Sequence, residues 1–584
     1  MTKQNDSISE TVTDMLSDFN VSRRDLLRGG AAVTAAATTG VVGSTSASAM
    51  GPLAGQVFGQ NPAQRRNAAR NLRRNSANRN RLQFPLVSQT NNGDETLYAD
   101  RRGSYSKSLL HNEFGEVDAA SFDSFLVALD SRDPADFENI IVGNATDTDR
   151  VRLVSPQAAF SFDQSGVDSN GYRMPNAPAF ASAETAAEMG ELYWYALTRD
   201  VPFLAYEDRN IIQRASDDLN AFSRSDIFLQ DGGAVTPGTI FRGTITGNGI
   251  GPFVSQFLYQ PFFFGRLEVE QRYDRPVKGA INDFMTDYDE WLGIQNGAAP
   301  SESTTFSGKK RFIATMRDLG EFVHVDFPIQ SPLYAFLICL GFGPDARDPN
   351  LPHTMFDQSA TQQPFVSFAE GGLPHLVMQG PRIGLLGAWF QKWAAHRRLR
   401  PEVYAGRINN MLRGRRVYDI NQEILDSDAL ARTIAATESD VATNQGLLPM
   451  GFPEGSPAHP AYPGGHSTFA AAGATLCKAI FDEDFVIPNP VQSNNSGTQL
   501  IPWGGEDLTI GNELNKLVGN ITHGRDGAGM HWRSDGRGNF IGEDVAISLL
   551  QDYSVTYNDA FDGFQLTRFD GTRIRIVNGQ VLPN

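Results

Sequence analysis

The feature of this sequence that most constrains its fold is a turn rich in proline and glycine that leads directly into a helix of small, apolar residues. The stretch begins at His459 and reads HPAYPGGHSTFAAAGATLCKAIF. A helix with so few polar residues is expected to be well buried. His466 falls at its start, where unpaired N–H groups and the helix dipole favour negative charge. The stretch therefore predicts an anion site at a helix N-terminus, although a glycine turn that only begins a helix is equally common.

The size and charge of the chain limit the function classes to which it can belong. With 584 residues, 40 % of them hydrophobic, the chain can form one large or two medium-sized domains. A formal net charge of −17 argues against nucleic acid as a partner, because a phosphate-binding surface needs an excess of Lys and Arg. Any small anion must therefore be held by a local cluster of basic side chains.

The N-terminus has the pattern of an export signal. Arg23 and Arg24 precede a weakly apolar stretch that ends in the small-residue sequence ASA at Ala49. This resembles a twin-arginine translocation (Tat) signal over residues 1–49, with a disordered Ala-rich tail as the alternative. We expect export of the folded protein to an extracellular or periplasmic location. No other segment has the roughly 18 apolar residues of a membrane helix, so we expect no membrane span in the mature chain.

The rest of the chain divides into four segments. Residues 50–110 form an Arg-rich segment that we expect to be irregular, and a solvated linker is favoured over a basic arm for an anionic partner. Residues 111–300 mix helical stretches with Gly/Pro-rich loops and predict an N-terminal helical region. Residues 301–553 predict a helical catalytic region. The DG and NG pairs in LTRFDGTRIRIVNGQVLP predict a small β-hairpin or meander in the tail, residues 554–584.

Lys392 and Arg400 belong to a segment with helical periodicity, GAWFQKWAAHRRLRPEVYAG. The residue before a proline is disfavoured in a helix, so this helix is predicted to end near Arg400, just before Pro401. Lys392 would then project from the helix and Arg400 from its end. The two side chains are candidates for an anion site, because a compact ammonium group and a forked guanidinium group bind oxyanions in different ways. The alternative is that they only form a solvated, basic helix end.

A third group of polar residues lies in GRDGAGMHWRSD, where Arg525 precedes His531 and Asp535. The four-residue spacing of His531 and Asp535 places them on one face of a helix, so the carboxylate can orient the imidazole ring and raise its basicity. A surface cluster of ion pairs is the alternative when this triplet is considered alone.

The three groups follow one another in a distinctive order: Lys, seven residues, Arg-Pro; then Pro-Gly-Gly-His; then Arg, five residues, His, three residues, Asp. This order resembles the vanadium-dependent haloperoxidases, especially the bromoperoxidase branch, whose fold and anion site are shared with the type 2 phosphatidic acid phosphatases. The stretches KWAAHRRLRPE, GFPEGSPAHPAYPGGHSTFAAAGATLCKAIFD and GMHWRSDGRGNFIGEDVAISLL carry the resemblance. It implies an all-α fold, in which helical bundles with long loops surround a vanadate- or phosphate-type anion site.

The resemblance also implies which residues hold the cofactor, vanadate. His531 would be the protein ligand bonded to the metal, vanadium, and Asp535 would orient it. Four other groups would hold the oxygen atoms of vanadate: the side chains of Lys392, Arg400 and Arg525 and the backbone N–H of Gly465.

Two histidines receive catalytic roles from the same resemblance. His466 would be the acid–base group beside the anion, and His459 would lie near the halide and oxidant pocket, with Trp389 as a pocket aromatic residue. The family's usual Ser before Gly-His is Gly464 here. One hydroxyl contact to vanadate is therefore absent, and we expect a lower affinity for vanadate.

The implied reaction is the oxidation of halide, with bromide and iodide favoured, by hydrogen peroxide to hypohalous acid, which halogenates small organic acceptors. Relatives are commonly homo-oligomers. One alternative is an acid phosphatase, with His531 as nucleophile and His466 as leaving-group acid. The other is a zinc-binding or non-catalytic helical scaffold that uses His459, His466, His523 and His531.

Overall fold

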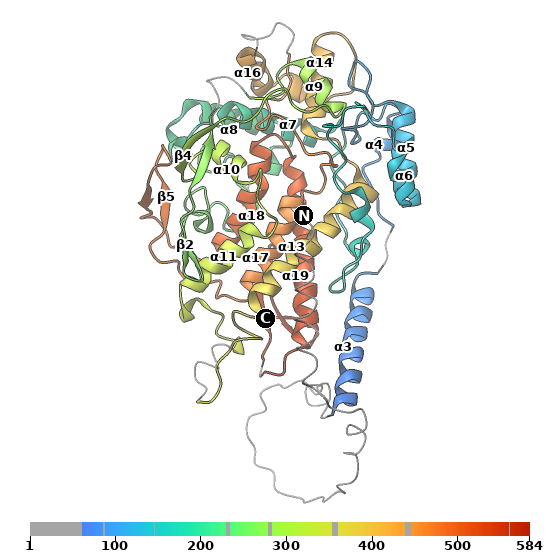
Figure 1. Cartoon of the computed structure of the whole chain (residues 1–584). Coiled ribbons are helices and arrows are strands. Elements are labelled where there is room, and N and C mark those ends of the chain that lie inside the picture. The colour runs from blue at the N-terminus through green and yellow to red at the C-terminus, as the bar shows by residue number, and fades with distance from the viewer. Residues whose placement is uncertain are drawn as a thin grey trace, which may run out of the picture. The chain divides into compact units, whose positions relative to one another are not determined.

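Helix α17 (Gly465–Lys478) forms the centre of the helical core, as its Ala-rich sequence predicts, and all but one of its residues are buried. Its small side chains let neighbouring helices approach closely. A Cβ atom added at Gly542 would come within 2.3 Å of the Thr468 carbonyl oxygen, so only glycine allows this approach. Four helices pack against α17 (Figure 1): α11 (Gln330–Gly341), α13 (Leu373–Phe390), α18 (Ile510–Gly527) and α19 (Gly538–Ser554).

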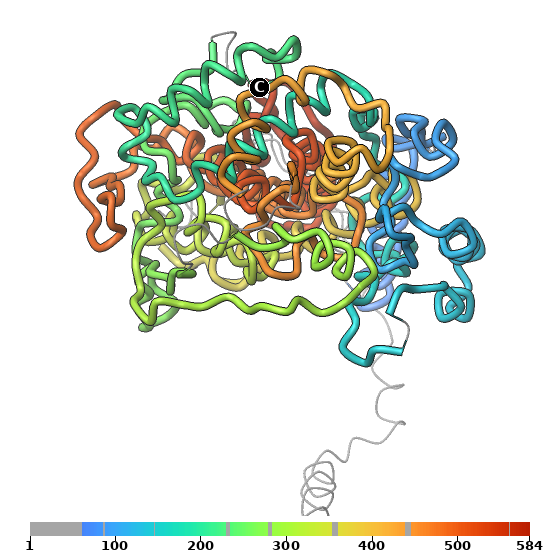
Figure 2. The backbone as a smooth tube through the Cα atoms, turned by 90° about the horizontal axis from the view of Figure 1, so that it is seen from above, coloured from blue at the N-terminus to red at the C-terminus, as the bar shows by residue number. Residues whose placement is uncertain are grey.

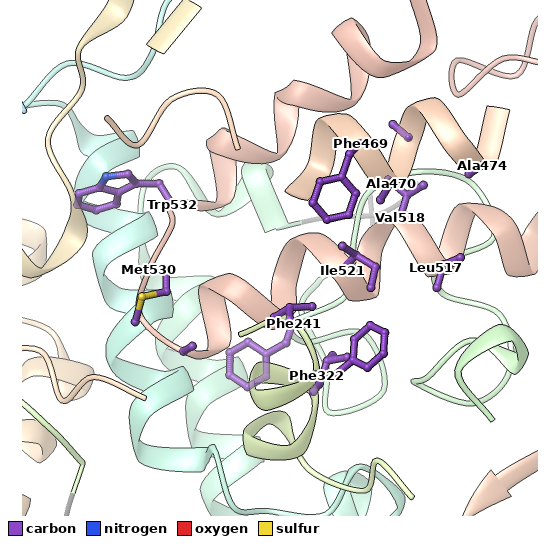
Figure 3. Close-up of a cluster of buried hydrophobic side chains, with 14 of the residues drawn as sticks. Phe241, Phe322, Phe469, Ala470, Ala474, Leu517, Val518, Ile521, Met530 and Trp532 are labelled. Carbon is purple, nitrogen blue, oxygen red and sulfur yellow. The ribbon is translucent and has the colours of Figure 1, made fainter. Parts of the chain in front are cut away.

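The contact between α17 and α18 is apolar and buried. Figure 3 shows Phe469, Ala470 and Ala474 of α17 above a row of α18 side chains, and each of these residues is at most 2 % exposed. The α18 row consists of Leu517, Val518 and Ile521. Burial of one such aliphatic side chain contributes roughly 1.5–3 kcal/mol, so this contact fixes α18, which carries Arg525, relative to the start of α17.

Earlier segments surround these C-terminal helices (Figure 2). The remaining helices have between 4 and 22 residues and are joined by long loops, as expected. They are α3 (Pro62–Gln83), α4 (Asp94–Leu97), α5 (Ala119–Ser131), α6 (Pro134–Glu138), α7 (Ala183–Thr198), α8 (Asn210–Ala221), α9 (Tyr288–Gln295), α10 (Met316–Phe322), α14 (Pro401–Leu412), α15 (Gln422–Leu425) and α16 (Asp428–Thr437).

The strands form small antiparallel sheets at the edges of the helical fold, which is the all-α class predicted. The tail forms a three-stranded meander, and its two turns contain Asp570-Gly571 and Asn578-Gly579, as predicted. The sequence analysis did not predict the pairs β1–β2, β3–β4 and β5–β6. The strands are β1 (Phe262–Phe264), β2 (Leu267–Val269), β3 (Tyr273–Pro276), β4 (Phe306–Arg311), β5 (Val491–Ser493), β6 (Leu500–Pro502), β7 (Phe564–Thr567), β8 (Arg573–Val577) and β9 (Gln580–Pro583).

The expectation that residues 50–110 are irregular is wrong for α3. Asn61 begins this helix with a capping box that includes Gln64, and Pro62 occupies the first helical position. The Ala, Arg and Leu residues that follow are good helix formers, and no glycine or proline interrupts them until the helix has ended. The arginines are therefore held on a regular helix.

The computed structural model describes residues 61–584 except 86–87, 145, 229–233, 278–282, 353–359, 438–444 and 560, and the described residues belong to one compact unit. The predicted Tat signal, residues 1–49, lies outside them. The boundaries at residues 300 and 553 stay predictions. Within the described ranges, no helix is both long and apolar enough to cross a membrane.

Candidate active site

The imidazole ring of His531 is held by a carboxylate on one side. Its Nδ1 atom lies 2.7 Å from Oδ2 of Asp535, and the same oxygen accepts the backbone N–H of Trp532 at 3.0 Å. The four-residue spacing predicts this contact between His531 and Asp535, but the two residues do not lie on one face of a helix. His531 lies in the loop before a short 3₁₀ helix, η9 (Arg533–Arg537), and Asp535 reaches back to the start of that helix as a cap.

The other ring nitrogen of His531 faces a guanidinium group. Nη1 of Arg400 donates to His531 Nε2 at 3.0 Å and to the carbonyl oxygen of Met530 at 2.7 Å. Because arginine only donates, Nε2 accepts, and the Nδ1 proton is donated to Asp535. His531 therefore presents an unprotonated Nε2 to the interior of the cluster, which is the form that binds a metal.

The helix that precedes Arg400 ends earlier than predicted. α13 continues as a π-helical segment, η8 (Gln391–His396), and Arg397 then takes a left-handed conformation with φ 40°. Arg400 is extended and comes directly before α14, in which Pro401 is the first residue. Proline is favoured at that position, so Pro401 begins a helix here instead of ending one.

Lys392 projects from η8 into the protein interior and is fully buried. Its Nζ atom donates to the carbonyl oxygens of Pro460 and Ala461 at 2.7 and 2.8 Å. Burial and the nearby charge of Arg400 lower the pKa of Lys392 well below its usual value. An anion at this point would restore the charged form of the lysine.

Arg525 lies in the last turn of α18. Its Nη1 atom donates to the carbonyl oxygen of Val323 at 2.9 Å, while its Nε atom is buried without a hydrogen-bond partner. Burial lowers the pKa of Arg525 to about 10. A buried N–H group without an acceptor is costly, so this side chain retains a donor for a bound anion.

The turn at the start of α17 lies beside these cations. Gly465 is the first helical residue, so its N–H group has no acceptor within the helix. A Cβ atom at Gly465 would lie 3.2 Å from the Trp389 ring and 3.3 Å from Leu385, so a larger residue would fit only if these side chains moved by a few tenths of an ångström. Glycine at this position therefore lets the turn lie close against two side chains of α13.

His466, the second residue of α17, contacts a residue that the sequence did not reveal. Its Nε2 atom lies 2.9 Å from Oδ1 of Asp326, whose other oxygen is buried without a partner. Burial lowers the pKa of His466, and Asp326 acts in the opposite direction. Asp326 comes 140 positions earlier in the chain, and no spacing or motif in the sequence links it to His466.

His459 lies on the other side of Arg400. Nη2 of Arg400 is 3.0 Å from His459 Nδ1, and the Trp389 ring centre is 4.9 Å from that of His459. Burial, Lys392 and Arg400 lower the pKa of His459 well below its usual value, so the ring is neutral near neutral pH.

The four histidines named for a zinc site are not arranged as one. His523 pairs with Asp526 at 2.7 Å, whereas His531 pairs with Asp535 and His466 with Asp326. Among the residues that the structure describes, no group of three or more His, Cys, Asp or Glu side chains is placed to hold a metal ion. The cluster around His531 consists of cations, which favour an oxyanion over a bare cation.

Comparisons with known proteins identify the family. Residues 386–558 match the family model of the VCPO second helical-bundle domain. The vanadium-dependent bromoperoxidase of Ascophyllum nodosum is 33 % identical over 505 residues, which cover 84 % of this chain and 88 % of that protein. The chain belongs to the vanadium-dependent haloperoxidases. The vanadium-dependent bromoperoxidase of Corallina officinalis is 32 % identical, with 84 % of this chain and 95 % of that protein covered.

The likeness to this haloperoxidase family extends to the fold and to the N-terminus. The homohexameric structure of a second vanadate-dependent bromoperoxidase from Ascophyllum nodosum superposes with a TM-score of 0.83 at 27 % identity, over 97 % of this chain and 98 % of that one. Residues 20–40 match the model of the Tat signal sequence, which supports export by that pathway.

The residues of the cluster fit the cofactor of the family, vanadate. Burial lowers the pKa of His531 well below its usual value, and the charges of Arg400, Lys392 and Arg525 lower it further, so all three cations lie close enough to act on its ring. The buried Nε of Arg525, which lacks an acceptor, and the N–H group of Gly465 add donors for oxygen atoms. The donor set therefore suits a tetrahedral oxyanion held beside His531 Nε2.

Proposed function

We propose that this haloperoxidase oxidises bromide and iodide with hydrogen peroxide, at a vanadate held by the cluster around His531. The observation that carries the proposal is the contact between Arg400 Nη1 and His531 Nε2 at 3.0 Å, with the charges of Lys392 and Arg525 directed at the same ring. A buried cluster of three cations is expensive in free energy unless an anion compensates it. Bound vanadate supplies a Lewis acid that activates hydrogen peroxide for attack by halide.

In this proposal the cations position the anion and His531 anchors it. Each charge-assisted hydrogen bond from Lys392, Arg400 or Arg525 contributes roughly 1.5–3 kcal/mol. Asp535 keeps the Nδ1 proton of His531 in place, so that Nε2 stays available as the ligand. The N–H group of Gly465 adds a fixed donor at the positive end of α17.

His466 is the proposed acid–base group, and Asp326 is its positioning residue. The carboxylate holds the ring through Nε2 and favours its protonated form. His466 can then accept the proton that peroxide loses on binding and return a proton as the oxidised halide leaves. About a fifth of the His466 side chain is exposed, so it can exchange protons with solvent.

His459 and Trp389 are proposed to line the halide side of the site. The two rings, which are tilted by 40° to one another, give a neutral, polarisable wall next to Arg400, which suits a large and weakly hydrated halide. The relatives named above are bromoperoxidases, which supports bromide as a substrate here. The products would be hypohalous acid and halogenated small organic acceptors.

Two further features of the protein are proposed. The homohexameric relative supports a homo-oligomer for the mature chain. Cleavage after Ala49 and release to an extracellular or periplasmic location are also proposed, and the match of residues 20–40 to the Tat signal model supports the export. The segment boundaries 50–110, 111–300, 301–553 and 554–584 are retained as proposals.

The test is bromination of a phenolic dye by the purified mature protein, after removal of bound metal and with or without added orthovanadate. We expect bromination that requires bromide, peroxide and vanadate together. Hydrolysis of an aryl phosphate by the vanadate-free protein, without vanadate-dependent bromination, would instead support the acid phosphatase.

A further inference from the structure

Helix α3 carries a row of arginines that the proposed chemistry does not use. The helix reads PAQRRNAARNLRRNSANRNRLQ and contains no acidic residue. At about 100° per residue, five of its arginines fall within an arc of roughly 100° on one face. All five are exposed: Arg66, Arg70, Arg73, Arg74 and Arg81. We call these residues the arginine face of α3.

The C-terminal end of α3 is tied to the rest of the protein. Arg79 forms an ion pair with Asp552 of α19, and the Asn80 side chain donates to the carbonyl oxygen of Gly166 at 2.9 Å. A cavity of about 1140 Å³ lies between α3 and the loop 162–171, and three residues of the arginine face, Arg73, Arg74 and Arg81, line it. The helix is therefore anchored at one end and stands away from the core along its side, as Figure 1 shows.

A helix of this composition needs a partner. It has no apolar stripe, and unpaired arginines on one face repel one another without helping the helix to form. The whole chain has a net charge of −17, and seven of its positive charges lie in α3. The chain without α3 therefore carries a still larger negative charge. Charge complementarity therefore favours a second copy of this chain as the partner.

A matching acidic surface is present on α5 and α6. These helices and their caps expose five carboxylates against a single exposed arginine, Arg132. The carboxylates belong to Asp118, Asp123, Asp130, Asp133 and Glu138. We call them the acidic face of α5–α6. An arginine face on one copy and an acidic face on the next give a head-to-tail contact, which closes into a ring when the rotation between copies completes a full turn and otherwise gives an open filament.

We propose that the arginine face of α3 docks on the acidic face of α5–α6 of a neighbouring copy and that this contact holds the homo-oligomer together. The inference rests on the oligomer proposed above and adds its interface. The contact is electrostatic, so high salt weakens it by screening.

The experiment measures the mass of the vanadate-loaded mature protein by light scattering, across a range of salt concentrations. We expect an oligomer at low salt that dissociates as salt rises, and a monomer for Arg66→Glu/Arg70→Glu/Arg74→Glu at all salt concentrations. The matched control is Arg209→Glu/Arg214→Glu/Arg266→Glu, which changes three exposed arginines outside α3 by the same charge and should remain oligomeric.

A charge swap identifies the partner face. Asp123→Arg/Asp130→Arg/Glu138→Arg should also be monomeric alone, and an equimolar mixture with the α3 variant should assemble, because each altered face then meets an altered partner. No assembly in the mixture would overturn α5–α6 as the partner face. An oligomeric α3 variant would overturn the role of α3 while leaving the oligomer intact, whereas a monomeric wild type at every salt concentration would overturn the oligomer as well.

Discussion

Asp535 holds His531 from the side opposite Arg400: its Oδ2 atom lies 2.7 Å from His531 Nδ1, and Arg400 Nη1 lies 3.0 Å from His531 Nε2. The carboxylate fixes the proton on Nδ1, and the guanidinium group marks the direction in which the Nε2 lone pair points. The ring is thus oriented for a ligand before any cofactor binds.

Replacing Asp535 with Asn tests this orientation. The amide keeps an acceptor but loses the charge that favours the correct ring orientation, so vanadate should bind roughly 10–100-fold more weakly. Equilibrium dialysis with elemental analysis measures the affinity. Asp526→Asn is the matched control, because Asp526 pairs with a buried histidine, His523, at the same 2.7 Å. Equal losses in the two variants would show that the effect is structural.

Replacing Asp326 with Asn tests the proton-transfer pair. Asp326 raises the pKa of His466, so its loss should lower that pKa further. The limb of the pH–rate profile that reports His466 should therefore move to lower pH, with roughly tenfold lower turnover. His466→Ala should lose turnover by roughly 10²–10⁴-fold. Vanadate affinity should change little in both variants, and a profile that does not move in Asp326→Asn would contradict the role given to this carboxylate.

His459→Ala should change which halides are oxidised more than it changes vanadate binding. The ring contacts Arg400 and Trp389, so its loss alters the wall of the halide side while His531 and the other cations remain. Steady-state kinetics with chloride, bromide and iodide across pH provide the measurement. We expect the wild type to use bromide and iodide with little chloride turnover. Efficient chloride oxidation by the wild type, or the same phenotype as His466→Ala, would contradict this assignment.

Lys392 is expected to make vanadate binding depend on pH. Burial and Arg400 lower the pKa of Lys392, and only its protonated form attracts an anion, so affinity should fall as the pH rises through that lowered pKa. Lys392→Met should bind roughly 10–150-fold more weakly near neutral pH and should show a flatter pH dependence. Calorimetric titration of both proteins with orthovanadate gives the two curves.

Lys478→Met is the matched control for Lys392→Met. Lys478 is also buried, with a pKa lowered by burial, but it donates to the Thr567 carbonyl oxygen outside the cluster. Replacing Lys478 should leave the affinity for vanadate, and the pH dependence of that affinity, unchanged. A pH dependence in Lys392→Met as steep as that of the wild type would show that another group controls binding.

Much of the fold could be predicted from local patterns. The small apolar residues of α17 allow close helix packing on all sides, and the two turns of the C-terminal meander follow from Asp-Gly and Asn-Gly pairs. The helix α3 was missed because asparagine and arginine carry no hydrophobic period. Its helical state depends on the capping box at Asn61 and on good helix formers, which charge composition does not reveal.

Local spacing was a weaker guide to the candidate site. Pro401 was expected to end one helix but begins another, because a proline fits the first turn of a helix as well as it stops the one before. Asp535 reaches His531 through a cap and not along a helical face. Asp326 could not be predicted, since its contact with His466 depends on the packing of α10 and the loop after it, far away in the chain.

The central claim is that His531 anchors vanadate at this cluster, and the vanadium content of His531→Ala tests it most directly. After dialysis against orthovanadate, the wild type should retain close to one vanadium per chain by elemental analysis, and so should His523→Ala, which removes a comparably buried histidine outside the cluster. His531→Ala should retain essentially none and should keep the helical content and melting temperature of that control. Stoichiometric vanadium in a folded His531→Ala variant would contradict the account.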